Sequence, residues 1–367
     1  MTDPDAELIE AELIRVRMPL VRPHHAAHGR ETVRDLVLVR VVLADGTEGW
    51  GECSALARPT YTGEHTAGAW AVLRDELVPA RLAGRSSPVV GHPMASSALL
   101  VAEADAHLRR ASRSLAGALA SRHGEVARTH LDVAAVVSRA DTVDDRLRMV
   151  AEHLEEGVAL VKLKTTPRRL DLEAVAAVRA AWPTLALAVD FNGTADLDSL
   201  VALAPLGLTY VEQPAGADAL VESAYFATRT DLPIALDESI TGVGTFASAV
   251  ALGAGSIVNV KPGRVGGPFV AAHLVDDAVN AGLAAFVGGM LETGVGRAAA
   301  AAVAALPGAT LPTDLGPSAR YLDPDLTEPV VVDGDGRLVV PDGPGIGRVP
   351  DPDAVAAVAI DRVLLAR

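Results

Sequence analysis

Short apolar runs alternate with alanine-rich stretches from residue 130 to residue 315. Each run is almost wholly apolar, which is typical of strands whose two faces are both covered by helices. We predict eight strands in LDVAAVVS, ALVKLKT, LALAVDFN, LTYVEQP, PIALDES, SIVNVKP, AAFVGGM and ATLPTDL. Stretches between them, such as RLDLEAVAAVRAAWP, have the apolar spacing of helices. Eight successive strand–helix units favour an α/β fold with a (β/α)8 TIM-type barrel over a doubly wound open sheet.

The residues before the barrel have a different pattern. AELIRVRMPL and DLVLVRVVLADGTEGWGEC predict a strand and a hairpin, and the next two apolar-periodic stretches predict helices up to about residue 120. Strands followed by helices indicate an α+β unit. Near the end, EPVVVDGDGRLVVPDGPGIG predicts a hairpin that packs back on this unit. We therefore expect an N-terminal domain over 1–128, a barrel over 129–317 and a C-terminal segment over 318–367.

Polar residues stand where the predicted barrel strands end. The C-terminal ends of barrel strands converge on one mouth, where the active site lies. We therefore expect residues from different strands to meet around one pocket. The candidates, in chain order, are Lys162, Lys164, Asp190, Asn192, Glu212, Asp237, Glu238, Lys261, Gly289, Met290 and Glu292.

Three of these residues are carboxylates on successive strands: Asp190, Glu212 and Asp237. Converging carboxylates repel one another unless a cation or protons neutralise them. Mg²⁺ prefers oxygen ligands and keeps positions for water or substrate. Each acid taken alone is better explained as a helix cap or a solvated loop residue than as a metal ligand. Three in successive strand-end positions favour a Mg²⁺ site, with Mn²⁺ as the alternative ion.

Three lysines accompany these acids. Lys162 and Lys164 end the second strand, and Lys261 ends the sixth, so it faces them across the predicted barrel. Like charges and a bound cation lower the pKa of a lysine towards the range of a general base. The alternative is that Lys261 reaches to the rim or pairs with a carboxylate. Opposed lysines and a metal predict removal of a proton alpha to a carboxylate, with stabilisation of the enediolate.

Composition excludes several function classes. The formal net charge is −15 and no Lys/Arg run offers a phosphate-binding surface, so we expect no nucleic-acid partner. No apolar run is long enough to span a bilayer, and the N-terminal residues lack a secretory pattern. Cys53 is the single cysteine and allows no intrachain disulfide. A cytoplasmic homo-oligomer is expected.

The motifs VKLKT, VDFN, VEQP, LDESI, VNVKPGRVGG and GGMLETGVGRAA resemble those of the enolase superfamily, in the muconate-lactonizing-enzyme-like subgroup. Within it, the chain is most similar to the o-succinylbenzoate synthase and N-succinylamino acid racemase group. The stretches RMPLVRP, EGWGEC and LTEPVVV extend the resemblance over nearly the whole chain. It implies that the N-terminal domain caps the barrel mouth, completed by the C-terminal segment.

The resemblance also implies residue roles. Asp190, Glu212 and Asp237 would hold the metal, and Lys164 and Lys261 would be the acid/base pair. The remaining candidates would contact a small carboxylate substrate or support the ligands; they are Lys162, Asn192, Glu238, Gly289, Met290 and Glu292. Arg297 has two interpretations, a carboxylate-binding residue or a surface salt bridge.

Three functions follow from these roles. The first is dehydration by an o-succinylbenzoate synthase in menaquinone biosynthesis, the second racemisation of N-acylamino acids or epimerisation of dipeptides, and the third a non-catalytic barrel scaffold. His24, His25 and His28 stand where relatives commonly carry aromatic residues, which bears on substrate choice.

Overall fold

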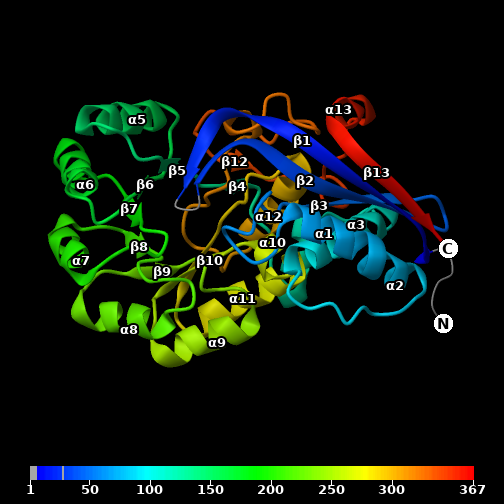
Figure 1. The fold of residues 1–367 in the computed structure, drawn as a ribbon, viewed down its shortest axis with the longest axis horizontal. Helices are drawn as coiled ribbons and strands as arrows, with labels where there is room; N and C mark the ends of the chain where they lie inside the picture. Colours follow the sequence, from blue (N-terminus) through cyan, green and yellow to red (C-terminus); the bar gives the residue numbers. More distant parts are fainter. Residues whose placement is uncertain (1–5, 27–28) are drawn as a thin grey trace.

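The computed structural model describes residues 6–26 and 29–367, whose strands form three sheets. The parallel sheet has the order β11-β10-β9-β8-β7-β6-β5, so consecutive strands are always neighbours. A doubly wound sheet would reverse its order at a switch point, which this sheet does not do. In Figure 1 these strands lie inside a ring of helices, and the sheet β13-β1-β2-β3 lies beside that ring with α1, α2 and α3.

The N-terminal sheet is built from long antiparallel strands. They are β1 (Leu8–Ala26), β2 (Gly29–Leu43) and β3 (Glu48–Cys53). The turn between β2 and β3 is tight, with Thr47 O accepting from Leu43 N at 2.9 Å and Gly46 at a φ of 84°. The hairpin predicted around ADGTEG is therefore confirmed.

Helices cover one face of this sheet. They are α1 (Thr66–Val72), a π-helical turn (Leu73–Leu77), α2 (Val78–Leu82) and α3 (Pro93–Arg110). After α3 come α4 (Leu115–Ala120) and a 3-10 turn (Ser121–His123), which pack against helices of the barrel instead. The second predicted helix is divided into α3 and α4 at Ser112, which has a φ of 51°. Strand β3 packs directly on α3. Gly49 and Gly51 allow this close approach, because a Cβ atom at either position would overlap backbone atoms of the helix.

The barrel strands match the predicted positions. They are β5 (Ala134–Val137), β6 (Leu160–Lys164), β7 (Leu187–Asp190), β8 (Tyr210–Glu212), β9 (Ile234–Leu236), β10 (Ile257–Val260) and β11 (Ala284–Val287). Their helices are α5 (Val143–Glu155), α6 (Arg169–Ala181), α7 (Leu197–Leu203), α8 (Leu220–Arg229), α9 (Val243–Leu252), α10 (Pro262–Val265), α11 (Pro268–Asn280) and α12 (Gly294–Ala304). Two 3-10 turns follow α7 and the barrel (Ala204–Leu206 and Ser318–Arg320).

The eighth predicted strand, ATLPTDL, is not a regular strand in the described chain, and this part of the prediction is wrong. The segment still spans the gap between the edge strands. Leu311 N donates to Ala285 O at 3.2 Å, and Ala134 N donates to Thr313 O at 2.8 Å. Pro312 has no N–H to donate, so the ladder is interrupted. Irregular pairing therefore connects β11 to β5.

The C-terminal segment differs in detail from the predicted hairpin. Only a single bridge joins Val332 to Leu338, and β12 (Leu338–Val339) pairs with β4 (His130–Leu131) instead. After α13 (Pro352–Val358), β13 (Ala359–Ala366) pairs with β1, a strand that the pattern did not predict. The last strand thus joins the N-terminal sheet. The domain boundaries at 128 and 317 stay a prediction.

A layer of side chains fills the barrel below the strand ends. Tyr210 and Phe286 stack with ring centroids 5.4 Å apart, and alanines on neighbouring strands leave room for the two rings. This layer closes the floor beneath the polar residues. Among the described residues, no helix is both long and apolar enough to cross a membrane.

Candidate active site

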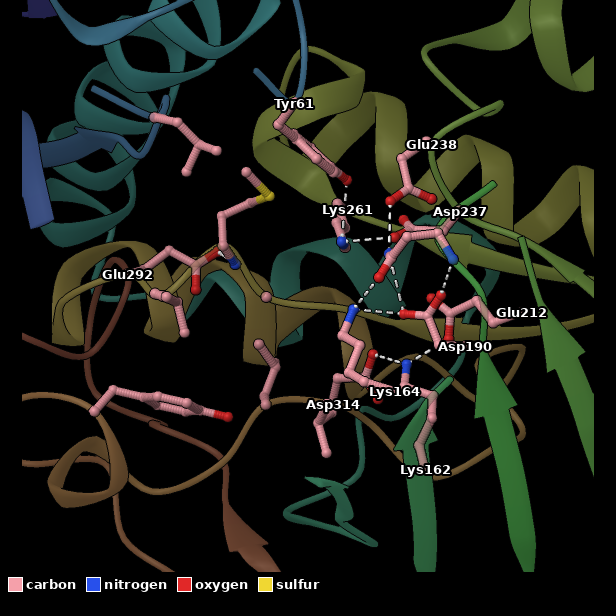
Figure 2. Close-up of a pocket in the computed structure, with 18 of the residues that line it drawn as sticks. Tyr61, Lys162, Lys164, Asp190, Glu212, Asp237, Glu238, Lys261, Glu292 and Asp314 are labelled. Atoms are coloured by element: carbon pink, nitrogen blue, oxygen red, sulfur yellow. Dashed lines mark hydrogen bonds and ion pairs between the residues drawn. The ribbon is translucent and has the colours of Figure 1, made fainter. Parts of the chain in front are cut away.

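The strand ends surround a cavity at the barrel mouth. Every predicted site residue lines it: Lys162, Lys164, Asp190, Asn192, Glu212, Asp237, Glu238, Lys261, Gly289, Met290 and Glu292. Figure 2 shows the acids and lysines grouped on one side and Glu292 on the other. The three cavity lysines are also the only lysines in the sequence, in which arginine supplies every other basic side chain apart from histidine. The primary amines of the side chains are thus confined to this cavity.

Lys162 is buried between two carboxylates. Its Nζ donates to Glu212 and, at 2.5 Å, to Asp314 Oδ2, and it lies 5.2 Å from the centroid of the Phe286 ring. Burial opposes the charge on Lys162, but Asp314 and Glu212 outweigh it and raise its pKa well above the usual value. Lys162 is therefore held as an ammonium group.

Lys164 is the neighbour of Lys162 on the same face of β6. Its Nζ donates to Asp190 Oδ2 at 2.6 Å and to Asn192 Oδ1 at 2.9 Å. Asn192 in turn donates from Nδ2 to Glu238 Oε1 at 3.0 Å. The amide of Asn192 thus orients the amine of Lys164 and links it to Glu238, which follows β9.

Lys261 lies beyond the end of β10, separated from β6 by three strands. Its Nζ donates to Asp237 Oδ2 at 2.8 Å and to Tyr61 Oη at 3.0 Å. Arg264 donates to the other oxygen of Asp237 and to the same tyrosine. Burial works against the charge of Asp237, but Lys261 and Arg264 together hold its pKa well below the usual range.

The predicted lowering of the lysine pKa is opposite to what these contacts produce. Burial lowers the pKa of both Lys164 and Lys261, but the charges of Asp190 and Asp237, respectively, outweigh it, and the net shift is upward. The sequence pattern places the carboxylates on adjacent strands, but it does not reveal that each one lies within hydrogen-bonding distance of an amine.

The donor set suits a divalent cation by its chemistry. Burial raises the pKa of Glu212 to about 8, and the charges of Asp190 and Asp314 add to the rise although Lys162 opposes it. Burial also raises the pKa of Glu238 to about 7, and its buried Oε2 has no hydrogen-bond partner. Carboxylates that resist ionisation this way are relieved by an added positive charge.

Asp190, Glu212 and Asp237 are not arranged as a set of metal ligands in this structure. Among the described residues, no three His, Cys, Asp or Glu side chains lie close enough together to hold a metal ion. We attribute this to the amines, because Asp190, Glu212 and Asp237 each contact a lysine. Oxygen donors on three adjacent strands fit Mg²⁺ or Mn²⁺, and a cation would compete with the lysines for them. The metal roles stay a prediction.

The other side of the cavity is the loop from Gly289 to Glu292. Arg34 Nη2 donates to Met290 O at 3.0 Å, and Glu292 Oε1 accepts from Met290 N at 2.6 Å. Leu291 has a φ of 56°, a conformation that side chains other than glycine rarely adopt. Arg34 belongs to β2, so the N-terminal sheet holds this wall of the cavity in place.

Glu52, at the end of β3, makes a second connection between the N-terminal sheet and the barrel. Its carboxylate accepts from Thr293 N at 3.1 Å and Gly296 N at 3.2 Å, at the start of α12. Burial raises the pKa of Glu52 to about 8; these hydrogen bonds oppose the rise and the nearby charge of Glu292 adds to it. The N-terminal sheet is thus joined to the helix that follows the cavity loop.

Known proteins share both the sequence and this architecture. The family model described as "Enolase C-terminal domain-like" matches residues 145–354. An N-succinylamino acid racemase from an Amycolatopsis species is 41% identical, over 97% of this chain and 99% of that protein. An o-succinylbenzoate synthase from Geobacillus stearothermophilus is 35% identical, over 92% of each. The chain belongs to the enolase superfamily.

A solved structure agrees with this assignment. An enolase-superfamily member from Listeria innocua superposes with a TM-score of 0.91 at 27% identity, over 98% of this chain and 99% of that one. The predicted family and barrel class are therefore confirmed. The relatives with these names are a racemase and a synthase, which are enzymes, so this chain is also an enzyme. Its specific reaction is a separate question, because the relatives have different names.

In this enolase-superfamily chain, three residues that contact the predicted acids and amines were absent from the sequence-based prediction. Asp314 ends the predicted eighth strand, and its position there was a usable signal. Arg264 follows Lys261 by three residues within VNVKPGRVGG, a motif from which only Lys261 was selected. Tyr61 comes from the N-terminal domain, and no local pattern indicated that it would reach Lys261. His24, His25 and His28 were predicted to bear on substrate choice. His28 and the side chains of His24 and His25 lie outside the described residues.

Proposed function

We propose that this protein removes the proton alpha to the carboxylate of a small substrate and stabilises the resulting enediolate with a divalent cation. The observation that supports this most is the meeting of Lys164, Lys261 and three carboxylates on one cavity. Asp190, Glu212 and Asp237 would hold Mg²⁺, with Mn²⁺ as the alternative. Bound there, the ion would supply positive charge that offsets the developing enediolate, and it would compete with the amines for the carboxylates.

The side chains of the chain carry the proton transfer. Lys164 in its neutral form takes the alpha proton, and Asn192 keeps its Nζ pointed at the substrate. Lys162 stays charged beside the substrate carboxylate, because Asp314 and Glu212 flank it. The closed floor and the cavity loop exclude bulk water around the reacting carbon.

Our principal candidate is o-succinylbenzoate synthase, a lyase of menaquinone biosynthesis. Lys164 removes the alpha proton of a succinyl-cyclohexadiene carboxylate and returns it to the leaving hydroxyl, so that water departs on the same face. Lys261 then needs only to remain a fixed cation. Its contacts with Asp237 and Tyr61, and the ring of Tyr61 5.1 Å away, hold it in that manner.

Racemisation of N-succinylamino acids is the second candidate. Two lysines on strands separated by three others approach a substrate from opposite faces, which is what a two-base racemase needs. The 41% identical relative named for this activity supports the same candidate. The non-catalytic scaffold is not retained, because the relatives that show the family are enzymes.

Deuterium exchange at the alpha carbon tests the shared step. With Mg²⁺ in D2O, we expect exchange into an N-succinylamino acid or the dehydration substrate. Lys164→Ala should lower it by about 10³-fold, as for loss of a general base. Arg169→Ala is the matched control, because it removes a positive charge from a side chain that is 91% exposed. Undetectable exchange in the unmodified protein would refute the proposed alpha-proton abstraction.

Lys261→Arg separates the two reactions. Arginine keeps a cation at this position but does not release a proton near neutral pH. Dehydration should therefore continue in this variant, whereas racemisation should stop. Loss of dehydration with retained racemisation would contradict both assigned roles of Lys261.

A further inference from the structure

Arg297 is a buried cation that lines the cavity without an acidic partner. It is 2% exposed, and its Nη1 and Nη2 donate to the backbone oxygens of Gly316 and Glu292. Among the described residues, no carboxylate lies within ion-pairing distance of it, and its buried Nε has no partner. The surface salt bridge considered for Arg297 is therefore wrong. Buried charges are normally paired, and because this one lines the cavity, a bound ligand can supply the anion.

The neighbours of Arg297 leave it available to a ligand. Glu292 turns its Oε1 to the amide of Met290 rather than to the guanidinium. The other arginine at this wall, Arg34, already has Glu31 at 3.3 Å. A guanidinium has five N–H donors, and the backbone oxygens use only some of them. Tyr321, whose ring centroid is 5.2 Å from Cζ, also lines the cavity and supports the flat group.

The cavity changes character from one side to the other. Lysines and carboxylates occupy the reacting side, and Glu292, whose backbone oxygen contacts Arg297, lies on the opposite side in Figure 2. Apolar side chains also line the cavity; they are Leu56, Val136, Met290, Leu291 and Leu315. A matching substrate has a reacting carboxylate, an apolar body and a second anionic group.

We propose that Arg297 binds a second, distal carboxylate of the substrate, so that the enzyme selects dicarboxylates over their neutral counterparts. This inference rests on the proposed function for the identity of the reacting end. The distal carboxylate supplies the anion that the guanidinium lacks. Planar two-point pairing with a carboxylate is the interaction for which arginine is best suited.

The test compares an N-succinylamino acid with the N-acetyl compound of the same amino acid in the exchange assay. Arg297→Met removes the charge. Both rates should fall, because the oxygen of Glu292 loses its donor. The succinyl-to-acetyl preference in kcat/KM should fall by a further factor of about 10 to 100, the range for hydrogen bonds to charged groups, with most of the change in KM.

Arg128→Met is the matched control. Arg128 donates to the backbone oxygens of Ala304, Leu306 and Ala309 at the other end of α12, and its Nε is also buried without a partner. It does not line the active-site cavity. This variant should lose stability yet keep the succinyl-to-acetyl preference.

The outcomes separate the two levels of inference. Equal losses for both compounds in Arg297→Met would overturn the distal site and leave only a support for the loop. If the unmodified protein exchanges neither compound, the proposed function fails, and calorimetric titration with the two compounds decides the distal site. Preferential binding of the succinyl compound that Arg297→Met abolishes would support it, and equal binding would overturn it.

Discussion

Asp314→Asn tests how the cavity keeps Lys162 charged. The substitution preserves the shape of the side chain but removes one of the two carboxylates beside a buried ammonium group. Lys162 is 2% exposed, so water cannot replace the lost charge. Glu212 remains as a partner, but it is also a predicted metal ligand. In the variant, Glu212 is therefore the only carboxylate among the described residues left to pair with Lys162, while it is also a predicted metal ligand.

The expected loss is about 3 kcal/mol in the free energy of unfolding. This is the lower end of the range for breaking a buried ion pair, because Glu212 and the new amide oxygen still accept hydrogen bonds. Urea unfolding measures it. Asp335→Asn is the matched control, since Asp335 pairs with Arg337 but is 79% exposed. The free energy of unfolding of the Asp335→Asn variant should change by no more than about 0.5 kcal/mol.

Lysine labelling gives an independent measurement. Because the chain has only three lysines, ¹³C-lysine NMR reports on the cavity alone. In Asp314→Asn the signal of Lys162 should move most, and alpha-proton exchange should slow. An Asp314→Asn protein as stable as the Asp335→Asn control, with an unchanged Lys162 signal, would refute the assigned role of Asp314.

Three further outcomes are expected. Chelation should abolish alpha-proton exchange, and added Mg²⁺ or Mn²⁺ should restore it; exchange that persists after exhaustive chelation would contradict the metal role. Gly51→Ala should destabilise the fold by about 3 kcal/mol or more in thermal or urea unfolding, because its Cβ would overlap Ala98 O and approach Ala102 N to 2.9 Å. Stability should fall as pH rises from about 4.5 to about 8, because folded Glu52 keeps a proton that the unfolded chain releases, and Glu52→Gln should reduce this slope in unfolding measurements.

The barrel was predictable because its signals are local. Each inner strand is a short apolar run whose last residues are polar, and parallel strands bring those residues to one mouth. This rule alone assembled Lys164, Asp190 and Glu212, and the structure places all of them on one cavity. The irregular eighth position was harder, since Pro312 removes a ladder hydrogen bond within an otherwise strand-like run.

Partners between distant segments could not be predicted in this way. Tyr61 reaches Lys261 across 200 residues of sequence, and Arg34 holds the oxygen of Met290 across 256. Nothing in the residues near each partner specifies the other. The sign of the lysine pKa shifts was predicted wrongly for the same reason, because it depends on how closely each amine approaches a carboxylate from another strand.

Sequence by itself determined the order of the first seven barrel strands and their helices, the family and most of the acids and amines at the strand ends, because each rests on local periodicity or contiguous motifs. Tertiary structure alone decided which amine contacts which acid, how β13 joins the N-terminal sheet, and that Arg297 lies buried in the cavity wall without an acidic partner among the described residues. Those features depend on side chains brought together from separate elements, and the energies of burial and pairing vary steeply with their positions.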